Sequence, residues 1–220
     1  MDKHSLTSRL TRLEDEIPKL SNTISAMKIT DTDTYGKNYE ELSMDAALRA
    51  EHIACSLRNL IYAANLVSKP VLMKETAKVH GIQITHSDRQ VQITLPGLIP
   101  KRNKRVNTTF LTDPLYASLE TYTKEYSLPH FKDCTVCFTH VFDHSLPLRR
   151  VRDYDNLECK QILDTVSGFL MVDDSGLFCD AYHTTEFGDS DYTVLTIMER
   201  DAFPEWLKAA ENRGKSISDF

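Results

Sequence analysis

Several protein classes are excluded by what this sequence lacks. Its 220 residues include only 7 glycines, and it contains no P-loop, dinucleotide fingerprint or G-x-S-x-G motif. NTP hydrolysis and acyl transfer therefore have no support in the sequence. No apolar run approaches the roughly 18 residues of a membrane span, and the first ten residues have no hydrophobic stretch suited to a signal peptide. We therefore expect a cytoplasmic protein.

Cysteine is also scarce. The chain has 5 cysteines, an odd number that is scattered and too small for a disulfide framework, which suits a reducing compartment. Cys134 and Cys137 form a C-x-x-C pair, but residues three apart on a strand face opposite sides, and no second pair accompanies them. We expect these two cysteines in the core rather than in a zinc or redox site.

A basic excess is missing as well. The sequence has 26 Lys and Arg against 32 Asp and Glu, a net charge of −6, which argues mildly against nucleic acid as a partner. The charge is uneven along the chain, however. Residues 81–160 carry 11 basic and 9 acidic side chains, a net of +2, whereas residues 161–220 carry 4 and 12, a net of −8. The middle of the chain therefore keeps a positive balance.

The first third of the sequence has the pattern of long helices. Leu, Ile and Met recur over residues 6–27 at alternating steps of four and three, which is typical of a short coiled coil or a helical hairpin. Pro18 is expected to break or kink this helix. A second helix is predicted over residues 39–67 and a third over residues 70–80. Since no ligand cluster is present, residues 1–80 are predicted to be a helical region for packing or oligomerisation.

From Gly81 onward the apolar pattern changes to a period of two, which predicts a hairpin over residues 82–95. The further predicted elements are a helix from Asp113 and Pro114 to Tyr126, a strand over 134–142, a helix from Asn156 to about Ser167, strands near 169–172, 177–185 and 192–199, and a helix over 204–212. This order predicts that residues 81–220 form an α/β domain of the α+β type. Its mixed sheet would have helices mainly on one face, and a helical hairpin would precede it.

The segment from Arg149 to Lys160 combines basic and acidic side chains between a strand and a helix. Asp153 and Asp155 lie two apart, and in an extended chain that spacing directs both carboxylates to one side. A second pair, Asp173 and Asp174, follows the next apolar segment, and a helix returning to an adjacent strand would bring Asp174 beside them. Such oxygen ligands suit magnesium or manganese, although either motif alone also occurs in ordinary turns and caps.

The basic residues beside these carboxylates favour a phosphate substrate. A metal ion activates water and screens developing charge, while guanidinium groups hold phosphate, so the combination suits phosphodiester hydrolysis. The basic side chains are Lys101, Arg102, Lys104 and Arg105 in a Pro-rich loop, and Arg149, Arg150 and Arg152 before the Asp-x-Asp pair. A basic run is more often a solvated loop than a phosphate site, so its acidic neighbours decide the interpretation.

The segments RRVRDYDNLECKQILD and FLMVDDSGLF, preceded by VQITLPGLIPKRNKR, resemble the RusA-type Holliday junction resolvases in the same order along the chain. The resemblance covers about residues 89–200. It implies a RusA-like fold, a homodimer, and cutting of four-way DNA junctions in recombination and repair with Mg²⁺ or Mn²⁺. It also implies that Asp153, Asp155 and Asp174 are metal-binding catalytic carboxylates, and that the two basic clusters bind DNA.

One position departs from this family. The family has a catalytic lysine four positions after the second Asp of its Asp-x-Asp motif, where this chain has Cys159, and Lys160 comes one residue later. One residue turns a helical side chain through about 100°, so Lys160 reaches the site only if the helix starts differently or the side chain swings back. Alternatively, Lys160 pairs with Asp164 one helical turn away.

Two histidines are weaker candidates. His140 and His144 share one face of a predicted strand and are close in sequence to the acidic segment. Histidines on strands are more often structural residues than ligands, and the sequence is compatible with either role.

Three functions are compatible with these patterns. The leading hypothesis is a magnesium-dependent, structure-specific DNA endonuclease that resembles the RusA resolvases, with Lys160 as a further catalytic candidate. The alternative is a RusA-like module that binds DNA or protein after catalysis has lapsed, which the Cys159 departure and the acidic final block favour. A third, structural class is an assembly protein that associates through residues 1–80, and a protein partner of these helices is also possible.

Overall fold

The computed structural model describes residues 3–63, 67–100 and 108–212. The chain divides into two compact units, residues 1–69 and 70–220, and each is described by itself. The sequence predicts a boundary between the helical region and the α/β domain after residue 80. In the structure, the two units divide after residue 69, so nearly all of the third helix, α3 (Lys69–His80), belongs to the second unit.

The first unit is a hairpin of two long helices, α1 (Lys3–Ile29) and α2 (Gly36–Ala63). Helix α1 continues through Pro18, so of the predicted break or kink at this residue the break was wrong, and the kink stays a prediction. Polar contacts join the two helices as well as apolar ones: Thr23 donates a hydrogen bond to Asp45 at 3.0 Å. Arg49 donates to the same carboxylate at 2.7 Å and also reaches Glu16 on α1 at 3.2 Å.

One stripe of the predicted heptad pattern is exposed on α1. Leu10, Ile17 and Ile24 follow one another at seven-residue steps, and 42%, 56% and 52% of their surfaces are accessible to solvent. Leu13, between the first two, is buried. The hairpin thus uses one half of the seam to pack α1 on α2 and leaves the other half exposed. Oligomerisation through residues 1–80 stays a prediction.

The second unit contains a five-stranded sheet in the order β1-β2-β5-β3-β4. Its strands are β1 (Gln83–Ser87), β2 (Gln90–Pro96), β3 (Cys134–Asp143), β4 (Cys179–Gly188) and β5 (Tyr192–Glu199). Its helices are α3 (Lys69–His80), α4 (Thr109–Glu125), α5 (Cys159–Leu170) and α6 (Phe203–Asn212). Strands β3 and β4 pair in parallel and all other neighbours are antiparallel. The predicted mixed α+β fold is confirmed.

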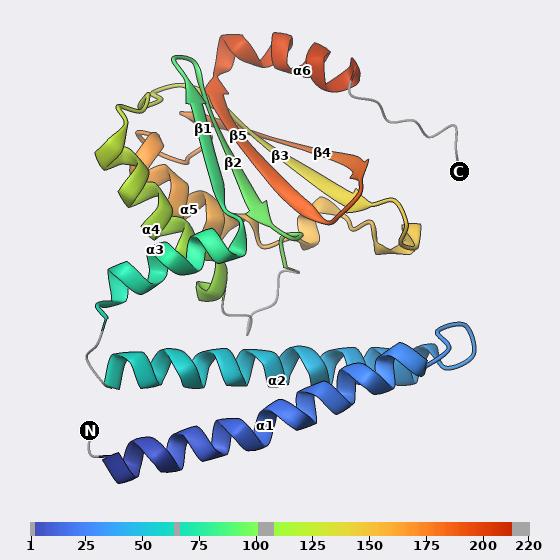
Figure 1. Ribbon diagram of the computed structural model, residues 1–220. Coiled ribbons are helices and arrows are strands. Elements are labelled where there is room, and N and C mark those ends of the chain that lie inside the picture. The colour runs from blue at the N-terminus through green and yellow to red at the C-terminus, as the bar shows by residue number, and fades with distance from the viewer. Residues whose placement is uncertain (1–2, 64–66, 101–107, 213–220) are drawn as a thin grey trace. The chain divides into compact units, whose positions relative to one another are not determined.

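The main core lies between the sheet and the helices α4 and α5, which Figure 1 shows together on one side of the strands. Alternate residues of each strand point to this side, because side chains of a strand alternate between its two faces. The fully buried side chains there include Val136, Phe138, Leu195, Ile197, Leu115, Leu119, Ile162 and Val166. On the other face, Thr139, Val194 and Thr196 lie near Trp206 of α6.

Three predicted boundaries were wrong in informative ways. Residues 169–172 are not a strand, because α5 continues to Leu170 and buries that residue with Ile162 and Val166 at steps of four. Helix α5 begins at Cys159 rather than Asn156. Helix α4 begins at Thr109, ahead of Asp113, because the carbonyl of Thr108 already accepts hydrogen bonds from the N–H groups of Leu111 and Thr112 at 2.8 and 2.9 Å.

Among the helices in the described ranges, none combines the length and the apolar character needed to cross a membrane.

Candidate functional site

The candidate site lies where the parallel strands β3 and β4 end and α5 begins. Helix α5 is the crossover that connects these two strands, and ligands of open α/β sheets commonly bind at the carboxyl ends of such strands. The connection from β3 to α5, residues 144–158, carries the predicted Arg cluster and the Asp-x-Asp pair. The fold therefore directs this segment to the end of the sheet where ligands are expected.

Hydrogen bonds hold Ile99, Pro100 and Thr108 beside this segment. Arg152 Nη1 donates to the carbonyl oxygen of Ile99 at 3.4 Å, and the N–H of Glu158 donates to that of Pro100 at 3.0 Å. On the other side, the hydroxyl of Thr108 donates to the side-chain oxygen of Gln161. Residues on both sides of the segment 101–107 thus contact residues 152–161. Lys101, Arg102, Lys104 and Arg105 themselves lie outside the described residues.

The second basic cluster is partly engaged within the protein. Arg150 forms an ion pair with Asp191, whose other carboxylate oxygen accepts the N–H of Asp143 at 2.9 Å. Arg149 is exposed, and Arg152 is half-buried against the carbonyl of Ile99. The three arginines therefore lie in one short segment but have different surroundings, and Arg149 has the most exposed side chain.

The three predicted carboxylates occupy two turns. Asp153 precedes the 3₁₀ turn η2 (Tyr154–Asn156), and Asp155 lies inside it, so the extended spacing that was expected to align them is not present. Asp174 is half-buried in the turn after α5, where its N–H donates to the Asp173 carboxylate at 2.9 Å.

The carboxylates suit magnesium by chemistry but are not assembled around one point. Their donor atoms are hard oxygens, which Mg²⁺ and Mn²⁺ prefer. In the described part of the chain, however, Asp153, Asp155 and Asp174 do not form a group of ligand atoms close enough to share an ion. Binding one ion between them therefore requires the two turns to approach each other.

Lys160 is paired with a carboxylate on the exposed surface of α5. Its ammonium donates a hydrogen bond to Asp164 at 2.7 Å, and this contact raises the pKa of Lys160. Asp174 adds a smaller electrostatic contribution in the same direction, so Lys160 lies within electrostatic reach of that carboxylate. The preceding residue, Cys159, occupies the inward position at the start of the helix.

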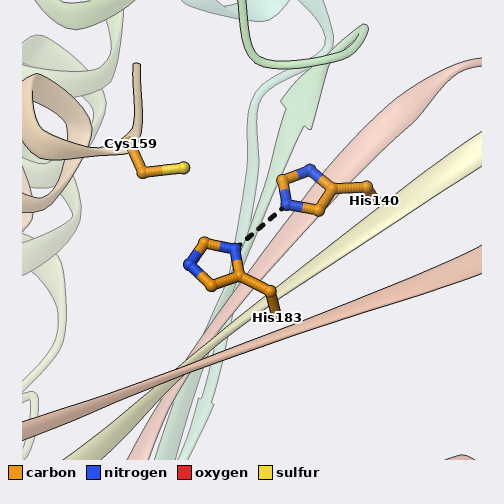
Figure 2. Close-up of side chains that lie close together, drawn as sticks. All are labelled: His140, Cys159 and His183. Carbon is orange, nitrogen blue, oxygen red and sulfur yellow. Dashed lines mark hydrogen bonds between the residues drawn. The ribbon is translucent and has the colours of Figure 1, made fainter. Parts of the chain in front are cut away.

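Cys159 faces two histidines, as Figure 2 shows. His140 comes from β3 and His183 from β4, and one ligand atom of each, together with the Cys159 sulfur, lie within 4.8 Å of one another. His140 Nε2 and His183 Nδ1 are 3.3 Å apart and share a hydrogen bond. In the ranges that the structure describes, this is the one group of three His, Cys, Asp or Glu side chains that could hold a metal ion.

Aromatic rings enclose the histidine pair. The rings of His140 and His183 are nearly parallel, at 6° with centroids 5.6 Å apart, and Phe138 stacks on His183 at 5.0 Å. Tyr154 stacks on His183 at 5.1 Å, and its hydroxyl lies 3.0 Å from that of Thr185. Tyr154 is the residue between Asp153 and Asp155. The Asp-x-Asp segment is therefore held by its central tyrosine against the histidines.

Burial controls the protonation of this cluster. Desolvation, with a smaller contribution from His183, lowers the pKa of His140 to about 4, and desolvation also lowers the pKa of His183. Both rings are therefore neutral at pH 7, which is the form that binds metal. Burial raises the pKa of the Cys159 thiol to about 12, so a thiolate at this position needs a neighbouring cation.

Sequence reasoning identified only part of this cluster. His140 was considered as a candidate with His144, but His144 lies beyond the end of β3, and its ring donates to the carbonyl of Gly188 at 2.7 Å. Cys159 was noted only as a departure from a family pattern, and His183 was not identified. These residues come from three elements, so no short sequence motif connects them. The order β3–α5–β4 was the feature of the sequence that could have indicated that they meet.

The fold and the cluster define the class of protein: an α+β domain with a partly buried His, Cys and His group beside exposed acidic and basic side chains. A family model described as a family of unknown function (DUF6100) matches residues 2–220, and the chain belongs to this family. No curated protein matches the chain.

Proposed function

We propose that this protein binds branched DNA at the end of the sheet formed by β3, β4 and the start of α5, and cuts it as a metal-dependent endonuclease similar to the RusA resolvases. The observation that carries the proposal is the attachment of both flanks of the basic segment 101–107 to residues 152–161. Residues on both sides of the basic segment 101–107, which itself lies outside the described residues, are thereby held beside the segment that carries the acidic turn. Basic side chains beside an acidic turn would supply the combination of charges that phosphodiester hydrolysis requires.

The charge distribution also supports the proposal. Arg149 is exposed in the segment that precedes the Asp-x-Asp turn, and Asp153 and Asp155 are exposed beside it. An ion held by Asp153, Asp155 and Asp174 would activate water and neutralise carboxylates that otherwise repel a phosphate backbone. The chain's own contribution is to position phosphate through arginine and to hold the acidic turn in place through Tyr154. A homodimer, as in the resembling family, belongs to the same proposal.

A second candidate is a DNA-binding or protein-binding module without catalysis. The observation that favours it is the position of Lys160, whose ammonium is paired with Asp164 on the surface of α5. The inward position is taken by a thiol that burial keeps protonated. No lysine is therefore directed at the strand ends by the described part of α5.

Cleavage and binding assays with one DNA set distinguish the two candidates. A four-way junction and a linear duplex of the same arms are incubated with the protein in Mg²⁺ or Mn²⁺, beside Asp155→Asn and the control Asp88→Asn in the β1–β2 turn. The endonuclease predicts junction cleavage by the wild type and by Asp88→Asn but not by Asp155→Asn. Binding without cutting supports the second candidate, and absence of DNA binding contradicts the endonuclease and the DNA-binding form of the second candidate.

The basic surface has its own test. Arg149→Ala should weaken binding to all DNA sequences equally and lower the salt slope of log K by about one, because one phosphate contact is removed. An unchanged salt slope would place DNA binding elsewhere on the chain. Solution mass with and without the junction would measure the expected homodimer.

A further inference from the structure

We propose that His140, Cys159 and His183 bind one zinc ion, with a water molecule in the fourth position. This inference concerns a site separate from the three carboxylates, and it stands or falls independently of DNA cleavage. It rests on the donor atoms, their separations and their burial.

The donor set selects the class of ion. Two imidazole nitrogens and one thiolate are borderline and soft ligands, which zinc accepts and magnesium does not. Three protein ligands with an open fourth position are typical of reactive zinc sites, whereas structural sites usually have four protein ligands. Cys159 and His183 are only partly buried, so solvent has access to the cluster from their side.

The separations are close to those of a tetrahedral site. Two nitrogens that each lie 2.0–2.1 Å from zinc are about 3.4 Å apart at the tetrahedral angle. His140 Nε2 and His183 Nδ1 are 3.3 Å apart. A nitrogen and a thiolate sulfur on the same ion would be about 3.6 Å apart. In the structure, the Cys159 sulfur and the two histidine nitrogens lie within 4.8 Å of one another. Small rotations of Cys159 and the two rings would complete the site.

One nitrogen of the buried histidine takes no part in this geometry. His140 is 1% exposed, and its Nδ1 is the buried side-chain nitrogen or oxygen that lacks a hydrogen-bond partner in the described residues. The nitrogen that faces His183 is Nε2, so an ion in the cluster would bind Nε2 and leave Nδ1 unpaired (Figure 2). The zinc proposal therefore rests on the three ligand atoms and their separations.

The position of Cys159 also favours a thiolate on binding. Cys159 is the first residue of α5, and the N-terminus of a helix stabilises negative charge. When zinc binds, the thiol proton leaves to solvent and the histidines bind as neutral rings. The ion would link Cys159 of α5 to β3 and β4, two strands that already pair through their backbones.

The test uses the full chain after removal of metal with a chelator. Cobalt(II), a spectroscopic substitute for zinc, is titrated into the protein, and bound zinc is measured by elemental analysis after dialysis. We expect one ion per chain, a thiolate-to-cobalt absorption band, and displacement of cobalt by zinc. Magnesium should not displace cobalt.

Matched variants assign the ligands. Cys159→Ser should remove the thiolate-to-cobalt absorption band. It should also weaken zinc binding by more than about 100-fold, because changing residues that only hydrogen-bond to a metal ligand already costs about 10–100-fold in affinity. Cys137→Ala is the control, because Cys137 is a fully buried cysteine that lies on the opposite face of the sheet from His140. Circular dichroism confirms that each variant is folded, and zinc should raise the melting temperature of the wild type and Cys137→Ala only.

Three results would overturn the inference. The first is the absence of a thiolate band at saturating cobalt. The second is a band of equal strength in Cys159→Ser. The third is an equal loss of zinc in Cys159→Ser and Cys137→Ala, which would show that zinc binding depends on packing and not on the Cys159 sulfur. Any of these would leave the histidine pair as a hydrogen-bonded element of the core.

Discussion

Acidification should destabilise the second unit through His140 when the protein is metal-free. The ring is buried in the folded chain, and its pKa is lowered from 6.5 to about 4 by desolvation and, to a smaller extent, by His183. Between these two pH values the unfolded chain binds a proton at His140 and the folded chain does not. The free energy of unfolding is therefore fully retained above pH 6.5 and falls as the pH is lowered to 4.

The magnitude follows from the shift. A change of one pKa unit corresponds to 1.36 kcal/mol, so the shift of His140 amounts to about 3 kcal/mol. This is a large part of the roughly 5–15 kcal/mol by which domains are stable. Below pH 4 both states carry the proton, and His140 contributes no further loss.

Trp206 gives a selective probe for this measurement. It is the single tryptophan of the sequence and lies on α6, with its ring 6.1 Å from that of Tyr182 on β4, so its fluorescence follows the second unit. Urea unfolding in a chelator is measured between pH 7 and pH 4 for the wild type, His140→Gln and the exposed control His130→Gln. The wild type and the control should lose about 3 kcal/mol more than His140→Gln. Parallel pH curves for all three proteins would refute the assignment of a buried, neutral His140.

Further substitutions test the packing and the backbone of the second unit by the same urea assay. Gly188→Ala places a methyl group 2.9 Å from Val141 Cγ1 and should lower the free energy of unfolding by about 1–3 kcal/mol. Adding Val141→Ala should restore part of this stability, and an unchanged urea midpoint in Gly188→Ala would contradict the close approach. Leu115→Ala, at a fully buried position of α4, should lower the free energy of unfolding by about 2–5 kcal/mol. Its control Leu177→Ala, at a position that is 82% exposed, should change it by less than about 0.5 kcal/mol. Equal effects of the two substitutions would contradict the assigned core. Gly81→Ala should cost about 1–2 kcal/mol because φ is +76° there, and a neutral result would exclude a left-handed backbone.

Much of the fold follows from the periodicity of apolar residues. Strand β2 alternates buried and less buried positions, whereas β5 does so only at its start, before a run of consecutive buried residues. The alternating steps of four and three in α1 mark that segment as a helix. The boundaries of α5 were harder to predict. Val166 and Leu170 continue the apolar stripe of the helix, but Leu170 also begins a short apolar run that resembles a strand. Tertiary packing decided between the two.

The candidate site was less predictable than the fold. Asp153 and Asp155 were visible as a local pair, but the 3₁₀ turn between them changes the directions of their side chains. His183 and His140 have no local relation, because their contact depends on the parallel pairing of β3 with β4. A pattern within one element can be read from the sequence, whereas a contact that needs strand order and register cannot.

The crossover that joins β3 to β4 has a consequence for how folding can be observed. His140 and His183 are 43 residues apart in sequence, and they meet only after α5 has returned the chain to the same edge of the sheet. Parallel pairing of this kind is slow, since a long loop must close before its contacts stabilise it. A cobalt absorption band at Cys159 would therefore appear during refolding only when this non-local step is complete. Comparing the rate at which the band appears with the rate of helix formation would show when β3 and β4 pair.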